Sequence, residues 1–264
     1  MWSSLFSKYR AREIHGLKEE RDALKKQVAE LMLCGAPSEL DRTLYPYPLP
    51  PTIDIWGFLA GVANKKECSI LEIGSREVVS KSECKTHLPL AQYTGFDFHE
   101  GPNVDVVGDV HRLTEYFEPN SMDLIVSVAV FEHLAMPWIV AEEIAKVLRV
   151  DGVAFISTHF SWSEHEMPWH FFQFNNTGLD VLFNKTLGFQ TVESGKGMPM
   201  VGRFAYDCDA NHAGRAISHL YCSSYIVTRK VAQMPASGTG GFQWRAALQD
   251  VYGKSEYPQG TSVV

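Results

Sequence analysis

The sequence has few cysteines, and they form no recognisable pattern. Five cysteines are spread over 264 residues, and none belongs to a Cys-x-x-Cys pair. A disulfide framework needs paired cysteines and a structural zinc site needs closely spaced ones, so the sequence disfavours both. This cysteine usage fits a reducing compartment, and we expect a cytoplasmic protein.

Long apolar runs and a positive net charge are also missing. No stretch approaches the ~20 apolar residues that cross a bilayer, and the N-terminus lacks the apolar core of a signal peptide. The formal net charge is -7, which gives no strong basic field to attract phosphates. We therefore expect no membrane span and no nucleic-acid partner.

Composition divides the chain into four parts. In residues 1–34 a narrow apolar seam at three-four spacing predicts an amphipathic, coiled-coil helix that forms a homo-oligomer; packing on its own domain is the alternative. The proline-rich residues 35–52 predict an extended linker. Residues 53–231 form the main domain, and the polar residues 232–264 predict a flexible tail. One small docking helix could form in this tail around Phe242, Trp244 and Leu248.

The main domain alternates between apolar strands and helical segments. We expect strands at residues 69–73, 93–97, 104–109, 122–130, 153–157, 189–193 and 219–227. Helices are expected at residues 53–64, 137–148 and 176–187. This alternation predicts an α/β fold with a Rossmann-like, mostly parallel seven-stranded sheet flanked by helices.

The first expected strand, Ile70-Leu-Glu-Ile73, ends in a glycine, Gly74, as strands do before a ligand-facing turn. Glu72 places a carboxylate inside this strand, where it needs a cation or a ligand donor as its partner. Asp97 follows Gly74 by 23 positions and is well placed to accept two ribose hydroxyls. Because Ser75-Arg-Glu77 lacks the glycines of a pyrophosphate loop, a nicotinamide enzyme is disfavoured and a cationic cofactor is favoured.

Six short motifs occur in the order found in class I S-adenosylmethionine-dependent methyltransferases. They are Ile70-Leu-Glu-Ile-Gly-Ser75, Gly95-Phe-Asp97, Gly108-Asp-Val-His111, Met122-Asp-Leu-Ile-Val-Ser127, Phe131-Glu-His-Leu134 and Val147-Leu-Arg-Val-Asp-Gly152. The chain resembles this family over roughly residues 50–230, its whole expected domain. Within the family it is similar to the branch that modifies sugars and other small molecules.

The resemblance implies S-adenosyl-L-methionine as cofactor and a role for nine residues. Glu72, Gly74 and Ser75 would line its methionine end, and Asp97 with Phe98 its ribose. The other four are Asp109 and Val110 at the adenine and Ser127 and Val128 under the sulfonium. The loop departs from the family at Ser75-Arg-Glu-Val78, where further glycines are usual. A catalytically silent, methyltransferase-like scaffold is therefore the alternative to an enzyme.

The acceptor side is expected in residues 158–174, which follow the fifth expected strand and hold three histidines and six aromatic residues. Aromatic walls with a few polar groups suit a sugar or polyol ring, so we expect O-methylation of a saccharide or another small hydroxylated metabolite. His159 and His165 are the candidate bases, because histidine titrates nearest neutral pH. His133 and His170 stand behind them; for any single histidine a structural role is the alternative.

A divalent metal held by Glu164, His165 and Glu166 is conceivable from the sequence. Adjacent residues rarely direct their side chains to one ion, so this set predicts no metal site.

Overall fold

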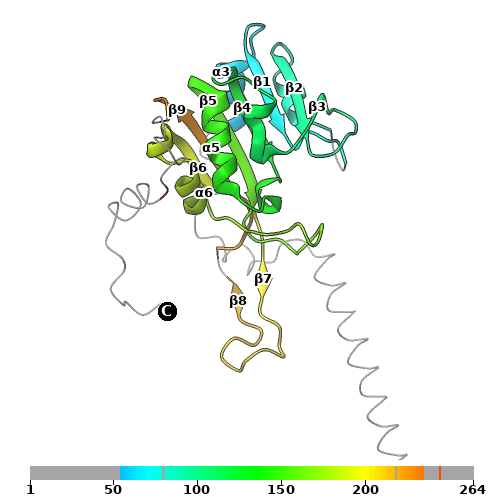
Figure 1. The fold of residues 1–264 in the computed structure, drawn as a ribbon. Helices are drawn as coiled ribbons and strands as arrows, with labels where there is room; N and C mark the ends of the chain where they lie inside the picture. The colour runs from blue at the N-terminus through cyan, green and yellow to red at the C-terminus, as the bar shows by residue number, and fades with distance from the viewer. Residues whose placement is uncertain (1–53, 79–80, 218, 235–243, 245–264) are drawn as a thin grey trace, which may run out of the picture. The chain divides into compact units, whose positions relative to one another are not determined.

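A computed structural model describes residues 54–78, 81–217, 219–234 and 244 (Figure 1). The predicted self-association helix at residues 1–34 and the linker at residues 35–52 lie outside these residues.

One mixed sheet of seven strands forms the centre of the domain (Figure 1). Its spatial order is β3-β2-β1-β4-β5-β9-β6. The bounds are β1 Ser69–Ile73, β2 Gln92–Asp97, β3 Val106–Val107, β4 Met122–Val128, β5 Leu148–His159, β6 Phe189–Pro199 and β9 Tyr221–Lys230. Strands β1 to β5 are parallel, and β9 runs antiparallel to both β5 and β6. The predicted Rossmann-like, mostly parallel seven-stranded sheet is confirmed.

The strand order reverses between β1 and β4, which are parallel neighbours. From β1 the chain proceeds outward to β2 and β3, then returns to the other side of β1 as β4. In open parallel sheets, ligands bind beyond the carboxyl ends of the strands at such a reversal. We therefore expect the ligand site at the edge of the sheet formed by the carboxyl ends of β1 and β4.

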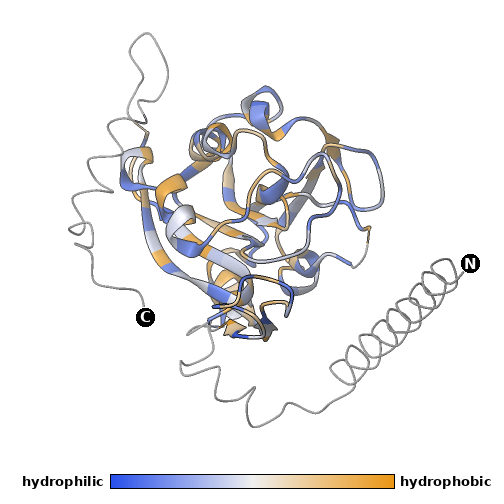
Figure 2. Ribbon diagram, turned by 90° about the horizontal axis from the view of Figure 1, so that it is seen from below, coloured by the Kyte–Doolittle hydropathy of each residue, from blue (hydrophilic) through white to orange (hydrophobic). Residues whose placement is uncertain are grey.

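Helical segments cover both faces of the sheet. One face carries α3 (Ile55–Ala63) and α4 (Glu83–His87), and its core includes Ile70 and Leu124. The other face carries α5 (Pro137–Val147), α6 (Asn176–Leu182) and the short 3-10 segments η1 (Val110–Glu115), η2 (Phe131–His133) and η3 (Lys185–Leu187). Figure 2 shows apolar stretches along the strands and helices and hydrophilic stretches in many connecting loops. Neighbouring residues of β1 and β4 alternate between the two cores, which explains why these strands read as continuous apolar runs.

Several element boundaries differ from the prediction. The third strand is shorter than residues 104–109, because Asp105 turns its carboxylate back to accept the Gly95 N–H at 2.8 Å. The helix expected at residues 176–187 ends at Leu182, since the Asn184 side chain caps a separate 3-10 turn through the Thr186 N–H at 2.9 Å. A small hairpin, β7 (Gly202–Arg203) with β8 (Ala216–Ile217), was not predicted.

Trp244 is the single described residue beyond position 234. It packs against the core, and its indole N–H donates to Glu142 Oε1 on α5 at 2.7 Å. Phe242 and Leu248, the other members of the predicted docking helix, lie outside the described residues. No helix in the described ranges combines the length and apolarity needed to cross a membrane.

Candidate functional site

The turn after β1 requires glycine. Gly74 adopts φ +78°, and its N–H donates to the Phe96 carbonyl at 2.8 Å. A Cβ at this position would come within 2.2 Å of Val130 Cγ2, so any side chain would collide with the segment after β4. Glycine here therefore lets the chains that leave β1 and β4 approach each other closely.

Glu72 is half-buried and already has two partners within the chain. Its Oε2 accepts hydrogen bonds from the hydroxyls of Ser82, at 2.6 Å, and Tyr93. Burial and the neighbouring carboxylate raise the pKa of Tyr93, so its hydroxyl stays protonated and donates. These hydroxyls already partner Oε2, so the burial of Glu72 does not by itself require a cation or a ligand donor.

Asp97 lies at the end of β2, directly beside the turn. Its two oxygens accept the backbone N–H groups of Arg76, at 3.3 Å, and His99, at 2.9 Å. The Arg76 Nε also lies 3.5 Å from Oδ1, so the arginine of the altered loop rests against the acid. A carboxylate can accept about four hydrogen bonds, which leaves capacity for two ribose hydroxyls.

The residues expected at the adenine lie beyond β3. Asp109 caps η1 and accepts from both the backbone N–H of His111, at 3.0 Å, and its ring Nδ1, at 2.8 Å. Burial alone would raise the pKa of Asp109, but these hydrogen bonds lower it, so the carboxylate stays ionised. Val110 buries its side chain in the core, which leaves only its backbone to face a ligand. Phe98, by contrast, is 65% exposed.

Two predicted serines are buried with unpartnered hydroxyls. Ser75 is 3% exposed and Ser127 is fully buried, and neither Oγ has a hydrogen-bond partner within the described ranges. The Ser75 hydroxyl faces Gly95, where a Cβ would lie 2.7 Å from it. Val128, at the end of β4, is 46% exposed and is the residue of this strand that reaches the edge.

Five residues form what we call the histidine cluster: Glu132, His133, His159, His165 and His170. Glu132 and His133 lie on η2, His159 ends β5, and the other two follow in the next loop. The His165 ring centroid lies 4.8, 5.0 and 4.7 Å from those of His133, His159 and His170. The cluster thus sits at the carboxyl ends of β4 and β5, beside the edge that carries Gly74 and Asp97.

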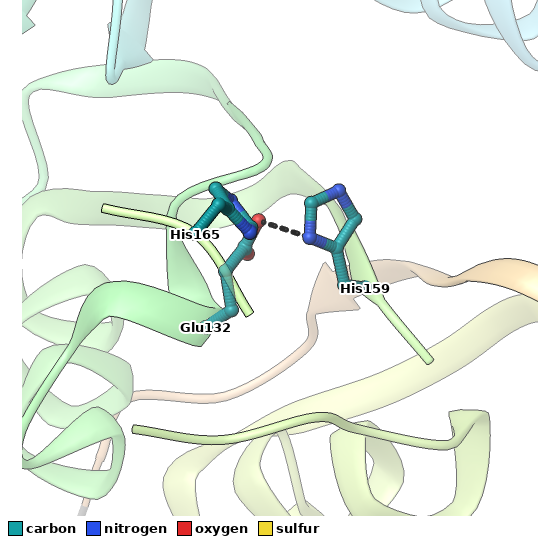
Figure 3. Close-up of side chains that lie close together, drawn as sticks. All are labelled: Glu132, His159 and His165. Carbon is teal, nitrogen blue, oxygen red and sulfur yellow. Dashed lines mark ion pairs between the residues drawn. The ribbon is translucent and has the colours of Figure 1, made fainter. Parts of the chain in front are cut away.

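A buried carboxylate lies at the centre of this cluster. Glu132 is fully buried, and its Oε2 accepts the Thr158 hydroxyl at 2.6 Å. Its Oε1 lies 3.1 Å from Nδ1 of His159, and Figure 3 shows the carboxylate between the His159 and His165 rings. Burial lowers the pKa of His159, and the neighbouring imidazoles act in the same direction although Glu132 opposes them. His159 is therefore neutral near pH 7.

The structure brings the two predicted bases, His159 and His165, together with the two histidines placed behind them. It also adds Glu132, which sequence reasoning missed as a site residue. An acid inside the apolar run Val128–Leu134 was the available signal, the same one that drew attention to Glu72. Glu164 and Glu166 flank His165 in the sequence. Of these two acids, Glu166 places its Oε2 3.8 Å from Nε2 of His133.

Comparison with known proteins gives one family match. Residues 71–156 match the model described as a methyltransferase domain. No curated protein matches the chain.

Similar solved structures include YcgJ of Bacillus subtilis, at 15% identity and a TM-score of 0.47, covering 67% of this chain and 97% of that one. TehB of Haemophilus influenzae has 18% identity and a TM-score of 0.44, with 66% and 61% covered. The 1,6-didemethyltoxoflavin-N1-methyltransferase of Burkholderia thailandensis, solved with S-adenosylhomocysteine, has 15% identity and a TM-score of 0.47, with 67% and 76% covered.

The family match spans β1 to β5, the strands whose carboxyl ends carry Gly74, Asp97, Asp109, Val128 and His159. The match to a methyltransferase domain over these strands supports an enzyme of the methyltransferase class with S-adenosylmethionine as its cofactor.

Proposed function

We propose that the enzyme transfers the methyl group to a hydroxyl of a saccharide or another small hydroxylated metabolite. The cofactor lies along the carboxyl ends of β1 to β4. Glu72, Gly74 and Ser75 face its methionine end and Asp97 and Phe98 its ribose. Asp109 and Val110 face its adenine, and Ser127 and Val128 lie under its sulfonium.

The observation that carries this proposal is the pair formed by the buried Glu132 and the half-buried His159 beside the cofactor edge. Methyl transfer to a hydroxyl releases a proton, and a hydroxyl is a poor nucleophile until that proton has somewhere to go. The pair sits where an acceptor would meet the methyl group, at the end of β5. We propose His159 and His165 as the catalytic residues.

The segment that carries these histidines also presents aromatic rings. Trp162, Trp169 and Phe171 are 47%, 64% and 42% exposed. Exposed indole and phenyl faces suit the apolar faces of a sugar ring, while imidazoles suit its hydroxyls. This combination supports a small hydroxylated acceptor.

The reaction needs alignment more than activation. The acceptor oxygen attacks the methyl carbon in line with the sulfonium, the carbon–sulfur bond breaks, and S-adenosylhomocysteine leaves as the hydroxyl proton passes to the histidine cluster. Holding the two reactants in this geometry can supply as much as ~7–11 kcal/mol. The neutral state of His159 leaves a ring nitrogen able to take the proton.

We also propose that residues 1–34 form a homo-oligomer and that the protein is cytoplasmic. The described cysteines Cys68, Cys84, Cys208 and Cys222 are all free, which fits a reducing compartment. Sedimentation of the full chain against a chain lacking residues 1–34 tests the first point, because an equal number of chains per particle in the two would exclude it.

The test of the acceptor uses S-adenosylmethionine with a labelled methyl group and a panel of monosaccharides, polyols and nucleotide sugars. We expect label transfer to a hydroxyl, lost by about 10²–10⁴-fold in His159→Asn. His212→Asn is the matched control, since His212 pairs with Asp209 at 2.8 Å on an exposed loop. Transfer only to amines or thiols, or full activity in His159→Asn, would overturn the proposal.

A further inference from the structure

The histidine cluster contains two buried polar atoms that face each other without bonding. Glu132 Oε1 and His159 Nδ1 are 3.1 Å apart, yet neither makes a hydrogen bond in the described part of the chain. Their distance suits a hydrogen bond, so the angles exclude it. Unsatisfied buried polar atoms are costly and call for a further partner. Both atoms are therefore open to a third group placed between them.

The charge of Glu132 points to a cation as that group. A fully buried carboxylate needs hydrogen-bond donors or a positive partner, and the Thr158 hydroxyl serves Oε2 alone. Within the described residues, its only ion-pair contacts are with imidazoles, those of His133 at 4.0 Å and His159 at 3.1 Å. The cluster thus combines one buried carboxylate with several imidazole nitrogens.

Backbone carbonyls fix which nitrogens carry lone pairs. Nδ1 of His165 lies 3.1 Å from the Ser163 carbonyl, and Nδ1 of His133 lies 2.9 Å from the Trp169 carbonyl. In a neutral ring these contacts place the proton on Nδ1 and the lone pair on Nε2. Metal-binding histidines commonly donate their other ring N–H to a carbonyl in this way.

His170 has the opposite arrangement. Its Nδ1 accepts the backbone N–H of His165 at 3.3 Å, so in the neutral ring the proton lies on Nε2. We therefore leave His170 out of the ligand set. It supports the His165 backbone instead.

Three ligand atoms converge in space although their residues are far apart in sequence. One from each of Glu132, His159 and His165 lies within 4.8 Å of the other two. Two ligands bound at zinc distances in a tetrahedron lie ~3.3 Å apart, close to the separation of Glu132 Oε1 and His159 Nδ1. The N–H groups of Phe171 and Phe172 donate to the Glu132 carbonyl at 2.8 and 3.2 Å, which ties the loop to η2.

We propose that Glu132, His159 and His165 bind a divalent transition-metal ion. His133 lies beside them as an additional candidate ligand. Two imidazoles and one carboxylate form a set that zinc commonly takes in catalytic sites, with a position left open. This inference extends the proposed function. Metal binding itself does not depend on that function, whereas a catalytic role of the ion rests on it. A bound ion lowers the pKa of a coordinated hydroxyl and takes over the activation that a free imidazole would otherwise provide.

The test measures metal binding directly on the full chain after treatment with a chelator. Zinc is titrated by calorimetry, and cobalt(II) reports the ligand geometry through its visible absorption. We expect one ion per chain and a tetrahedral or five-coordinate cobalt spectrum. His165→Ala should weaken zinc binding by at least about tenfold. His165 lies in a loop, so its removal leaves the core intact, whereas Glu132→Gln serves as a second variant checked for folding by circular dichroism.

His212→Ala is the control, because it removes a histidine that also pairs with a carboxylate but belongs to no three-ligand group among the described residues. Absence of zinc binding in the wild type would overturn the proposal, and so would equal weakening in the His165 and His212 variants. Binding of S-adenosylmethionine is measured on the same metal-free samples. A protein that binds the cofactor but no metal would reject this site and leave the methyltransferase proposal standing.

Discussion

At the residue scale, single atoms decide how the site is built. Gly74 has a left-handed backbone and no room for a Cβ, while Glu72 is satisfied by two hydroxyls. The sequence predicted the importance of Gly74, because glycine after an apolar run is typical of a tight turn. It could not predict the partners of Glu72, since Ser82 and Tyr93 reach it only through the fold.

The turn gives the first prediction. Gly74→Ala should destabilise the protein by about 3 kcal/mol, because it combines left-handed backbone strain with overpacking against Val130. Adding Val130→Ala removes the overpacking, so the double variant should lose less than the sum of the two single losses. Urea unfolding followed by circular dichroism measures both.

Gly61→Ala is the control for this pair. Gly61 lies within α3, and a Cβ there meets nothing within 4 Å. It should leave stability unchanged or raise it by about 0.5–1 kcal/mol. Equal losses in the two alanine variants would show that the turn has no special requirement for glycine.

At the scale of elements, one buried carboxylate joins α5 to η1. Glu143 is 5% exposed on α5, and its Oε2 accepts both the N–H and the hydroxyl of Thr114, at 2.8 and 2.7 Å. Its Oε1 accepts from Lys146 at 2.6 Å. Burial alone would raise the pKa of Glu143, but the hydrogen bonds from Lys146 and Thr114 lower it below 4.5.

This contact predicts a pH-dependent share of the stability. A lowered pKa in the folded state means that the contribution is present above pH 4.5 and is lost as the pH falls through the folded-state value. Glu143→Gln should cost about 1–3 kcal/mol at pH 7, and its difference from wild type should shrink on acidification.

Urea unfolding from pH 7 to pH 3.5 measures this difference, with Glu115→Gln as the control. Glu115 is an exposed acid of η1 whose Oε2 lies 3.5 Å from Nη1 of Arg112. A Glu143→Gln deficit that stays constant with pH would contradict the assigned role.

Element boundaries mark where sequence reasoning reached its limit. The long apolar strands β1 and β4 and helix α5 were predicted nearly to the residue, because their patterns are strong. The short β3 and the end of α6 depend on the side chains of Asp105 and Asn184. The hairpin of β7 and β8 has only two residues in each strand, too few to produce a pattern.

At the scale of the whole molecule, the order of alternating strands and helices was enough to predict the fold. The proposed cofactor residues come from motifs at strand ends, and parallel strands bring those ends to one edge. The histidine cluster was only half predicted. His159 and His165 lie in one segment and were predicted from the sequence. Glu132 lies on η2, between β4 and α5, and only the structure shows that it lies beside them.

The central claim is that this edge binds S-adenosylmethionine through Asp97. Calorimetric titration of the full chain with S-adenosylmethionine and S-adenosylhomocysteine tests it most directly, with Asp97→Ala as the variant. The control is Glu118→Ala, which also removes an acidic side chain. Glu118 is exposed and lies just before β4, at the end of this strand opposite to the expected site.

We predict micromolar binding, about −8 kcal/mol, to the wild type. Glu118→Ala should bind equally well, and Asp97→Ala should lose at least about tenfold, because two hydrogen bonds to a charged acceptor disappear. A wild-type protein that binds neither ligand, or an Asp97→Ala variant that binds as tightly as the wild type, would contradict the account.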